Sequence, residues 1–205
     1  MESVMTKVTR FAPSPTGTLH IGGVRTALFN FVYSKQQKGK FLIRIEDTDA
    51  ERSTREFEDN ILKGLADMGI VPDETPVRQS ERVDLYQNAI DRIINSGKAY
   101  YCDCSKERLD QMRSHQQAKG LKPQYDGKCR NLNLGKSEKS VLRLKTPQTG
   151  ELIFHDLVRG EVIFQNSELD DLILVRSDGS PTYHFCNVID DHDQGVTNVI
   201  RGEDH

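Results

Sequence analysis

The sequence lacks the features that mark membrane, secreted or strongly basic nucleic-acid-binding proteins. No stretch approaches the roughly 20 apolar residues of a membrane span, and the first ten residues hold no apolar run of signal-peptide length. The net charge of −3 and the pI of about 6.1 provide no general basic field for nucleic acid. We therefore expect a cytoplasmic protein with no membrane partner, in which any RNA contact is local.

Cysteine is also scarce. The four cysteines are too few and too unevenly spaced for the disulfide framework of a secreted protein, although Cys102 and Cys104 form a close pair. Reduced thiols or a metal site fit this pattern better. With 205 residues, the chain is long enough for one large domain that carries an insertion.

The N-terminal part of the chain follows the pattern of strand, turn, helix and strand. Residues 7–11 indicate a short strand that must end at the prolines and glycine of residues 12–17. Apolar residues recur at helical spacing over residues 21–37, with Gly39 as the expected stop, and residues 41–45 form the next strand. Such a βαβ unit predicts a parallel sheet with ligands at the carboxyl ends of its strands.

Two helices and an insertion are expected after this unit. Ser53 and Glu56 resemble a capping box that opens the first helix, and Ser80 opens the second, which ends before Gly97. From Ala99 the composition changes to that of an inserted subdomain. There we predict a polar helix at 105–119, strands at 140–146, 151–155, 161–165 and 172–176, and a hairpin turn at 177–180.

The segment from Thr18 to Gly23 lies where the first strand gives way to the helix. Its backbone N–H groups and the positive end of the helix dipole would face an anion. His20 can donate to phosphate oxygens, while Gly22 and Gly23 let a phosphate or a flat ring lie against the backbone. Taken alone, such a turn is as often packing geometry as a phosphate site.

Three longer motifs give this turn its context. They are RFAPSPTGTLHIGG at residues 10–23, RIEDTD at residues 44–49 and RGEDH at residues 201–205. Together they resemble glutamyl-tRNA synthetases of the bacterial type, which are class I aminoacyl-tRNA synthetases, and the resemblance covers the whole chain. Gly23 departs from the class I signature, which ends in a second histidine, and we interpret this as reduced phosphate contact.

The resemblance implies an α/β fold, a Rossmann-like parallel sheet with an inserted α+β subdomain. Residues 1–98 would be the first half of the nucleotide-binding fold, and residues 99–185 a subdomain that binds the tRNA acceptor stem. Residues 186–205 would return to the core, which the chain re-enters near Val199. The family's second ATP loop and anticodon-binding domain would lie beyond His205, so we expect this chain alone to bind ligands weakly and not to charge tRNA.

The activity implied is that of a glutamate–tRNA ligase. Such an enzyme uses ATP with Mg²⁺ to make glutamyl-adenylate and then transfers glutamate to the 3′ end of tRNA(Glu), and we expect it to be a monomer. Glutamate presents an ammonium group and two carboxylates, so its site needs both cationic and anionic groups. By resemblance, the glutamate pocket comprises Arg10, Ala12, Ser14, Glu46, Tyr183, Asn187 and Arg201. The ATP site comprises Thr18, His20, Gly22, Gly23, Glu203, Asp204 and His205, with the catalytic role assigned to His20, Gly22 and Gly23.

Three cysteines of the insertion have the spacing of a structural zinc site, a close pair followed by a distant third. Family members with zinc have Cys-Xaa-Cys followed by Cys-Xaa-His, but Asn131 occupies the last position here. An insertion that folds without metal is an equally open alternative. The candidate ligands are Cys102, Cys104, Cys129 and Tyr125, with His115 as a remoter substitute for the tyrosine.

Residues 190–193, Asp-Asp-His-Asp, also invite a metal interpretation. On a strand, consecutive side chains point to opposite faces, so at most two of them could share an ion. We interpret the segment as a structural turn, with a contact to tRNA or to the pocket left open, and Cys186 as a buried apolar residue.

Three other functions stay open. One is a glutamyl-queuosine tRNA synthetase-like paralogue, which activates glutamate without an anticodon domain. Another is a small nucleotidyltransferase without an RNA substrate, which would not need the glutamate pocket. The last is a chain that binds ligands without catalysis.

Overall fold

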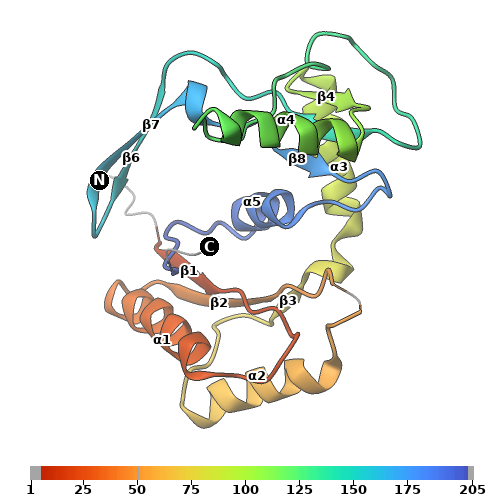
Figure 1. The fold of residues 1–205 in the computed structure, drawn as a ribbon. Helices are drawn as coiled ribbons and strands as arrows, with labels where there is room; N and C mark the ends of the chain where they lie inside the picture. The colour runs from red at the N-terminus through yellow and green to blue at the C-terminus, as the bar shows by residue number, and fades with distance from the viewer. Residues whose placement is uncertain (1–5, 50, 203–205) are drawn as a thin grey trace. The chain divides into compact units, whose positions relative to one another are not determined.

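The structure is a computed structural model that describes residues 6–49 and 51–202. The chain divides into two compact units, one built from the residues up to Tyr86 together with those from Cys186 onward, the other from residues 87–185 (Figure 1). The predicted α/β class is confirmed, with a parallel sheet in the first unit.

The first unit holds the predicted βαβ arrangement. Strands β1 (Val8–Phe11), β2 (Lys40–Ile45) and β3 (Val77–Arg78) form a parallel sheet in that order. Helix α1 (Ile21–Gln36) connects β1 to β2, and α2 (Arg55–Asp67) follows β2. The strand and helix bounds lie within a residue or two of those predicted for β1, α1 and β2.

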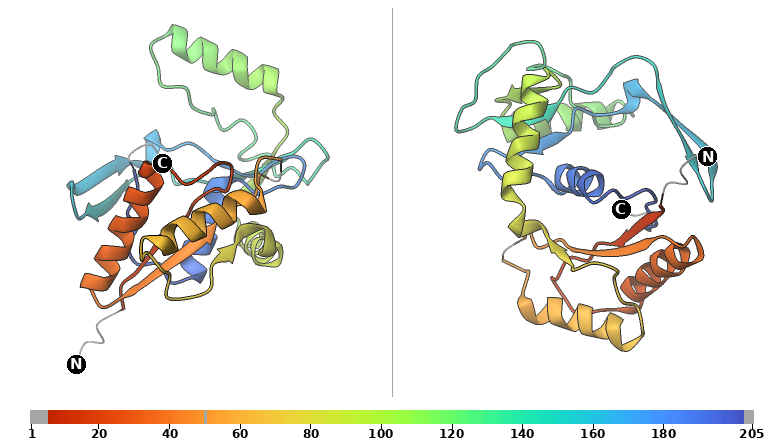
Figure 2. Two further views of the ribbon diagram at one scale, coloured as in Figure 1. Left: turned by 90° about the horizontal axis from the view of Figure 1, so that it is seen from below. Right: turned by 180° about the vertical axis from the view of Figure 1, so that it is seen from behind.

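The two faces of this sheet have different chemistry. Phe11, Phe41 and Ile43 point into an apolar core shared with α1 and α2. Because side chains alternate along a strand, Arg10 and Arg44 point to the opposite face. There they contact helix α5 (Tyr183–Asp193). Figures 1 and 2 show α5 on one side of the sheet and helices α1 and α2 on the other. One face of the sheet is therefore a core, and the other is polar.

Two expected helix boundaries at the first unit are wrong. The N-cap of α2 is Thr54 and not Ser53, because the Thr54 hydroxyl is the one that accepts from the N–H of Phe57, at 3.2 Å. Helix α1 ends at Gln36, and the left-handed residue that follows it is Lys38, with a φ of 52°, and not Gly39. Gly39 is required for a different reason, since a Cβ there would lie 2.0 Å from the Lys7 carbonyl oxygen.

Ser80 does not open the next helix. It lies in a short 3₁₀ segment (Gln79–Glu81), and helix α3 is Val83–Asn95. The N–H and the hydroxyl of Ser80 both donate to the carboxylate of Asp47, at 2.8 and 2.6 Å. These bonds tie Ser80 to the end of β2, and the helix begins three residues later.

The chain returns to the first unit earlier than Val199. Residues 190–193 belong to the last turn of α5, so their interpretation as a turn is wrong. Beyond the helix, the N–H groups of Thr197 and Asn198 donate to the Val8 carbonyl, at 2.9 and 3.1 Å. Helix α5 is stable here because its carboxylates meet arginines of the sheet, a contact that local sequence cannot reveal.

The second unit contains the helix and strands predicted for the insertion. A three-stranded antiparallel sheet is accompanied by a separate two-stranded hairpin. The turn after β8 closes on a single bridge between Val175 and Pro181 and leads into α5, so it joins no full hairpin. The elements are β4 (Ala99–Cys102), α4 (Lys106–Ala118), β5 (Val141–Leu144), β6 (Glu151–Asp156), β7 (Gly160–Gln165), a 3₁₀ turn (Asn166–Glu168) and β8 (Ile173–Val175).

Among the residues that the structure describes, no helix has both the length and the apolar character to cross a membrane.

Candidate active site

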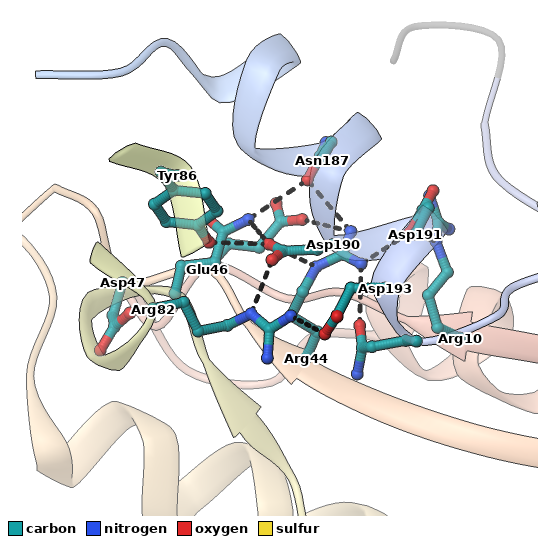
Figure 3. A network of polar contacts seen from close by, with 12 residues as sticks. Arg10, Arg44, Glu46, Asp47, Arg82, Tyr86, Asn187, Asp190, Asp191 and Asp193 are labelled. Carbon is teal, nitrogen blue, oxygen red and sulfur yellow. Dashed lines mark hydrogen bonds and ion pairs between the residues drawn. The ribbon is translucent and has the colours of Figure 1, made fainter. Parts of the chain in front are cut away.

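Arg44 is the centre of a polar network between β2 and α5 (Figure 3). Its Nη1 donates to Asp191 at 2.6 Å and to Gln194 at 3.1 Å, and its Nη2 donates to Glu46 at 3.2 Å and to Asn187 at 3.1 Å. The side chain has no exposed area. A buried guanidinium is tolerated only when it is paired, so these contacts fix Arg44 in one orientation.

Arg10 joins the same network from β1. Its Nε donates to Oδ1 of Asp191 at 3.1 Å, and its Nη2 donates to Oδ2 of the same residue at 3.3 Å. Only 5% of the residue is exposed. Its third nitrogen, Nη1, donates to no residue in the described part of the chain. The guanidinium therefore has one edge occupied and one edge available for an anion.

Glu46 is a buried carboxylate beside these arginines. It is 4% exposed, and its contact to Arg44 is its only side-chain hydrogen bond within residues 6–49 and 51–202. Burial raises the pKa of Glu46 to about 7, against the opposing effects of Arg44 and Arg10. A cation that reached this carboxylate would stabilise its charged form.

Asp190 anchors α5 to the chain around β3. Its Oδ2 accepts from Gln79 at 2.8 Å and from the Tyr86 hydroxyl at 2.9 Å, and its Oδ1 accepts from Arg82 at 2.7 Å. Burial, and then the neighbouring Asp190 charge, raise the pKa of Tyr86, so the phenol remains a donor. Arg82 also binds Asp193 (Figure 3). The contacts of Asp190 thus hold α5 against the chain around β3.

His20 is the N-cap of α1, and its imidazole shapes the start of that helix. Nδ1 accepts a hydrogen bond from the N–H of Gly22 at 3.2 Å, so the neutral ring carries its proton on Nε2. The side chain is exposed, and the first turn of α1 contains no acidic residue. An outward N–H donor and an uncompensated helix dipole together favour an anion.

The two glycines after His20 have different physical roles. A Cβ on Gly22 would lie 3.0 Å from Cε1 and 3.1 Å from Nδ1 of His20, so a side chain there would displace the imidazole. A Cβ on Gly23 would meet Leu19 at 3.4 Å and Phe11 at 3.6 Å. Gly22 therefore protects the histidine cap, whereas Gly23 mainly permits close packing of the helix on the strand.

Three thiols converge in the second unit. The sulfur atoms of Cys102, Cys104 and Cys129 all lie within 4.8 Å of one another, and those of Cys104 and Cys129 are 3.6 Å apart. The hydroxyl of Tyr125 lies 3.3 Å from the Cys102 sulfur and 3.6 Å from the Cys104 sulfur. Asn131 and His115 are both exposed. The structure thus brings together the four candidate ligands predicted first.

Not every predicted site residue joins the network around Arg44. Of the seven predicted for glutamate, the structure connects Arg10, Glu46 and Asn187. Tyr183 is four residues before Asn187 on α5 and so lies on the same side of the helix. The other three have no side-chain hydrogen bond or ion pair to a described residue, and neither has Thr18 of the predicted ATP site; the three are Ala12, Ser14 and Arg201. The last predicted ATP-site residues lie outside the described range: Glu203, Asp204 and His205.

Sequence reasoning missed two residues at the centre of the network. Arg44 begins the motif at residues 44–49, and its spacing of two from Glu46 is the period that places strand side chains on one face. Asp191 belongs to the segment that the sequence predicts as a turn. The spacing of Asn187, Asp191 and Gln194 by three or four residues is a helical signal, but one carried by polar side chains.

The chain matches the profile of a known family over residues 6–205, and that family is described as tRNA synthetases class I (E and Q), catalytic domain. The chain belongs to this family. The residues matched include both strands, the helix start and the α5 segment that build the site.

Similar proteins of this family come from several bacteria. The glutamate–tRNA ligases of Francisella philomiragia and Oleidesulfovibrio alaskensis are each 54% identical to the chain, over 199 and 198 residues. These alignments cover 96% and 97% of the chain but 42% and 43% of the relatives. The crystal structure of a glutamate tRNA ligase from Elizabethkingia meningosepticum, in complex with its amino acid, superposes with a TM-score of 0.84 at 39% identity. It covers 97% of the chain and 44% of that protein.

The predicted family is confirmed by these matches. The chain spans less than half the length of the class I relatives it resembles. The activity of a whole ligase is therefore only proposed for this chain.

A prediction at the helix start separates the two tasks of His20. His20→Ala should remove both the helix cap and the outward N–H donor, and lower ATP binding or turnover by about tenfold or more. His20→Asn should keep the cap, because asparagine is a good N-cap, but its Nδ2 amide lies closer to the backbone than Nε2 of histidine, so the contact to phosphate should still be lost. ATP titrations and thermal unfolding of both variants test this. Full ATP use by His20→Asn would show that the backbone alone holds the phosphates.

Proposed function

We propose that the protein is the glutamate-activating and part of the ATP-binding region of a glutamate–tRNA ligase. The reaction joins glutamate to ATP as glutamyl-adenylate and then transfers glutamate to the 3′ end of tRNA(Glu). We place this activity in the cytoplasm and expect a monomer.

The observation that carries the proposal is the pairing of Arg10 and Glu46 in one buried network. Arg10 offers a guanidinium edge without a partner among the described residues, which suits a carboxylate, and Glu46 offers a carboxylate, which suits an ammonium group. Both residues come from adjacent parallel strands, near their carboxyl ends, where ligands bind in such sheets. An amino acid with a second carboxylate matches this arrangement of charges.

The chemistry follows from positioning. An oxygen of the α-carboxylate attacks the α-phosphorus of ATP, a new O–P bond forms, and the bond to pyrophosphate breaks. No protein nucleophile is needed, because such a step depends on orientation and on stabilising the charge that develops on phosphate. The proposed contribution of the chain is the Nε2–H of His20 and the N-terminus of α1, with Mg²⁺ entering together with ATP as part of the substrate.

Selectivity should follow from the same charges. Glutamine would place an uncharged amide against the open edge of Arg10, which would keep Asp191 but lose the charge-assisted pair with a substrate carboxylate, at a cost of about 3 kcal/mol. That difference corresponds to a discrimination of about a hundredfold or more.

The test is glutamate-dependent exchange of pyrophosphate into ATP, with and without tRNA. It is run on this chain, with a full-length glutamate–tRNA ligase of the family as the positive control. Exchange that requires glutamate and rejects glutamine would support the proposal. Exchange with no amino acid preference would contradict it, and exchange without any amino acid would favour a simple nucleotidyltransferase.

We also infer that the cysteine cluster binds Zn²⁺. Tetrahedral zinc with Zn–S bonds of about 2.3 Å sets neighbouring sulfurs about 3.8 Å apart, close to the 3.6 Å between Cys104 and Cys129. Tyr125 would be the fourth ligand, in the place of the usual histidine. A closed shell of four protein ligands makes such a metal structural, where it cross-links the loop of Cys129 to β4.

Zinc content provides a direct check. The purified protein should contain about one zinc per chain, and Cys129→Ser should lose it, whereas His115→Ala, a change at the exposed remoter candidate, should retain it. Tyr125→Phe keeps the ring and removes only the oxygen, so it should release zinc to a chelator faster than the unmodified protein. A content far below one per chain would contradict the assignment. Equal release from Tyr125→Phe would exclude the tyrosine as a ligand.

A further inference from the structure

Asp191 connects helix α5 to arginines on two strands of the sheet. Oδ1 of Asp191 accepts from Nη1 of Arg44 at 2.6 Å and from Nε of Arg10 at 3.1 Å, and Oδ2 accepts from Nη2 of Arg10 at 3.3 Å. The Asp191 side chain is 21% exposed, while the side chains of Arg10 and Arg44 are 7% and 0% exposed. One carboxylate therefore holds two largely buried cations (Figure 3).

The edge of Arg10 that Asp191 occupies decides which edge remains. A guanidinium has a side edge, made by Nε and one terminal nitrogen, and an end edge, made by the two terminal nitrogens. Asp191 takes the side edge through Nε and Nη2. The end edge, with Nη1 and the second hydrogen of Nη2, is left for a bidentate carboxylate.

The sharing of the Asp191 charge also leaves Arg10 able to attract an anion. If Asp191 bound Arg10 alone, its negative charge would neutralise the positive charge that attracts the substrate carboxylate. Its shorter contact is to Arg44, at 2.6 Å, so its single negative charge is shared between two guanidiniums. Arg10 therefore keeps attraction for an anion while its long side chain is held in one conformation, and a fixed side chain has less freedom to lose when a ligand binds.

We propose that Asp191 is a positioning residue for the amino-acid substrate, because it turns the end edge of the Arg10 guanidinium toward the side-chain carboxylate of glutamate. Asp191 does not touch the substrate; it acts through Arg10, and Arg44 keeps Asp191 in place. This inference rests on the proposed function.

The experiment is a double-mutant cycle on glutamate binding, measured by calorimetry on the full chain. Asp191→Asn should weaken glutamate binding by about tenfold or more in the otherwise unmodified protein, and should reduce the preference for glutamate over glutamine. In an Arg10→Met background, the same change should alter the dissociation constant by less than about twofold, since its effect passes through Arg10. Asp193→Asn is the matched control, because Asp193 lies on the same helix but binds Arg82. Its glutamate affinity should stay unchanged.

The outcomes are separable. If the unmodified chain binds glutamate and Asp191→Asn binds it equally well, or if Asp191→Asn loses the same factor with and without Arg10, the positioning role is overturned and the proposed function stands. If the unmodified chain binds no glutamate, both are overturned. Thermal unfolding confirms that each variant is folded. Should Asp191→Asn unfold, Asp191→Glu keeps the charge, displaces it by one methylene and should still weaken binding.

Discussion

Replacing Asp190 with alanine is expected to lower the free energy of unfolding by about 3–5 kcal/mol, the range for breaking a buried ion pair. Asp190 has no exposed side-chain area, and its carboxylate accepts from Arg82, Gln79 and Tyr86. The substitution leaves these donors without an acceptor. It also removes an anion 3.6 Å from Nε of Arg44, a nitrogen that has no hydrogen-bond partner in the described part of the chain. Each unpaired buried donor adds a desolvation cost.

Asp193 provides the control for this prediction. It lies three residues further along α5 and also binds Arg82, but its side chain is 47% exposed. Asp193→Ala should therefore cost no more than about 1 kcal/mol, as for other exposed ion pairs. Urea unfolding at pH 7, followed by circular dichroism, compares the two variants. Similar losses for both would mean that burial does not govern the strength of this network.

Glu46→Gln is expected to have opposite effects on binding and stability. Glutamine keeps an oxygen that can accept from Arg44, but it removes the negative charge that would bind the ammonium group of the substrate. Loss of that charge pair should weaken glutamate binding by about a hundredfold. Stability at pH 8 should rise by on the order of 2 kcal/mol, because the variant no longer holds a buried carboxylate in its charged form.

The raised pKa of Glu46 determines how the stability of the protein changes with pH. Burial raises the pKa of Glu46 to about 7 in the folded protein, above the ordinary value of 4.5 for the unfolded chain. Between these values the folded state binds the proton more tightly, so the free energy of unfolding falls as the pH rises from about 4.5 to about 7. The stability difference between Glu46→Gln and the unmodified protein should therefore be small near pH 5 and largest above pH 7.

Glutamate affinity should show the same titration. The ammonium group needs ionised Glu46, so affinity should fall as the pH drops below about 7, and this slope should be absent in Glu46→Gln. The charged groups that face Glu46 are Arg44, Arg10 and Asp191. Calorimetry at pH 6, 7 and 8 measures the slope. A variant that binds as tightly as the unmodified protein, or that is less stable at pH 8, would contradict this account of Glu46.

The core side of the sheet could be predicted from local sequence. Residues 41–45 alternate between the two faces of a strand, and the proline and glycine signals before α1 leave few alternatives to a βαβ unit. The cysteine spacing was equally informative, because a close pair with a distant third restricts the geometry that can bring thiols together. In both cases the physical cause lies within a short stretch of chain or in the chemistry of one residue type.

The polar side could not be predicted in this way. Helix α5 buries Phe185 and Cys186, as predicted for the cysteine, but it also buries Asn187 and Asp190, so apolar periodicity marks only part of its inner face. Its last turn contains three aspartates, which are poor helix formers at that end, since the helix dipole disfavours negative charge there. Arginines on β1, β2 and the segment before α3 compensate for this. The helix is therefore a product of tertiary pairing.

The same pairing determines when the site can exist during synthesis. Arg10 and Asp191 are 181 residues apart, and the whole 87–185 unit is made between the two parts of the network. At roughly 5–20 residues per second, a ribosome would need about 5–20 s to proceed from Tyr86 to the end of α5. For that time the guanidiniums of Arg10 and Arg44 have no carboxylates from α5 and stay hydrated, so the sheet cannot close its polar face. The first strand made is among the last parts of the molecule to reach its final environment.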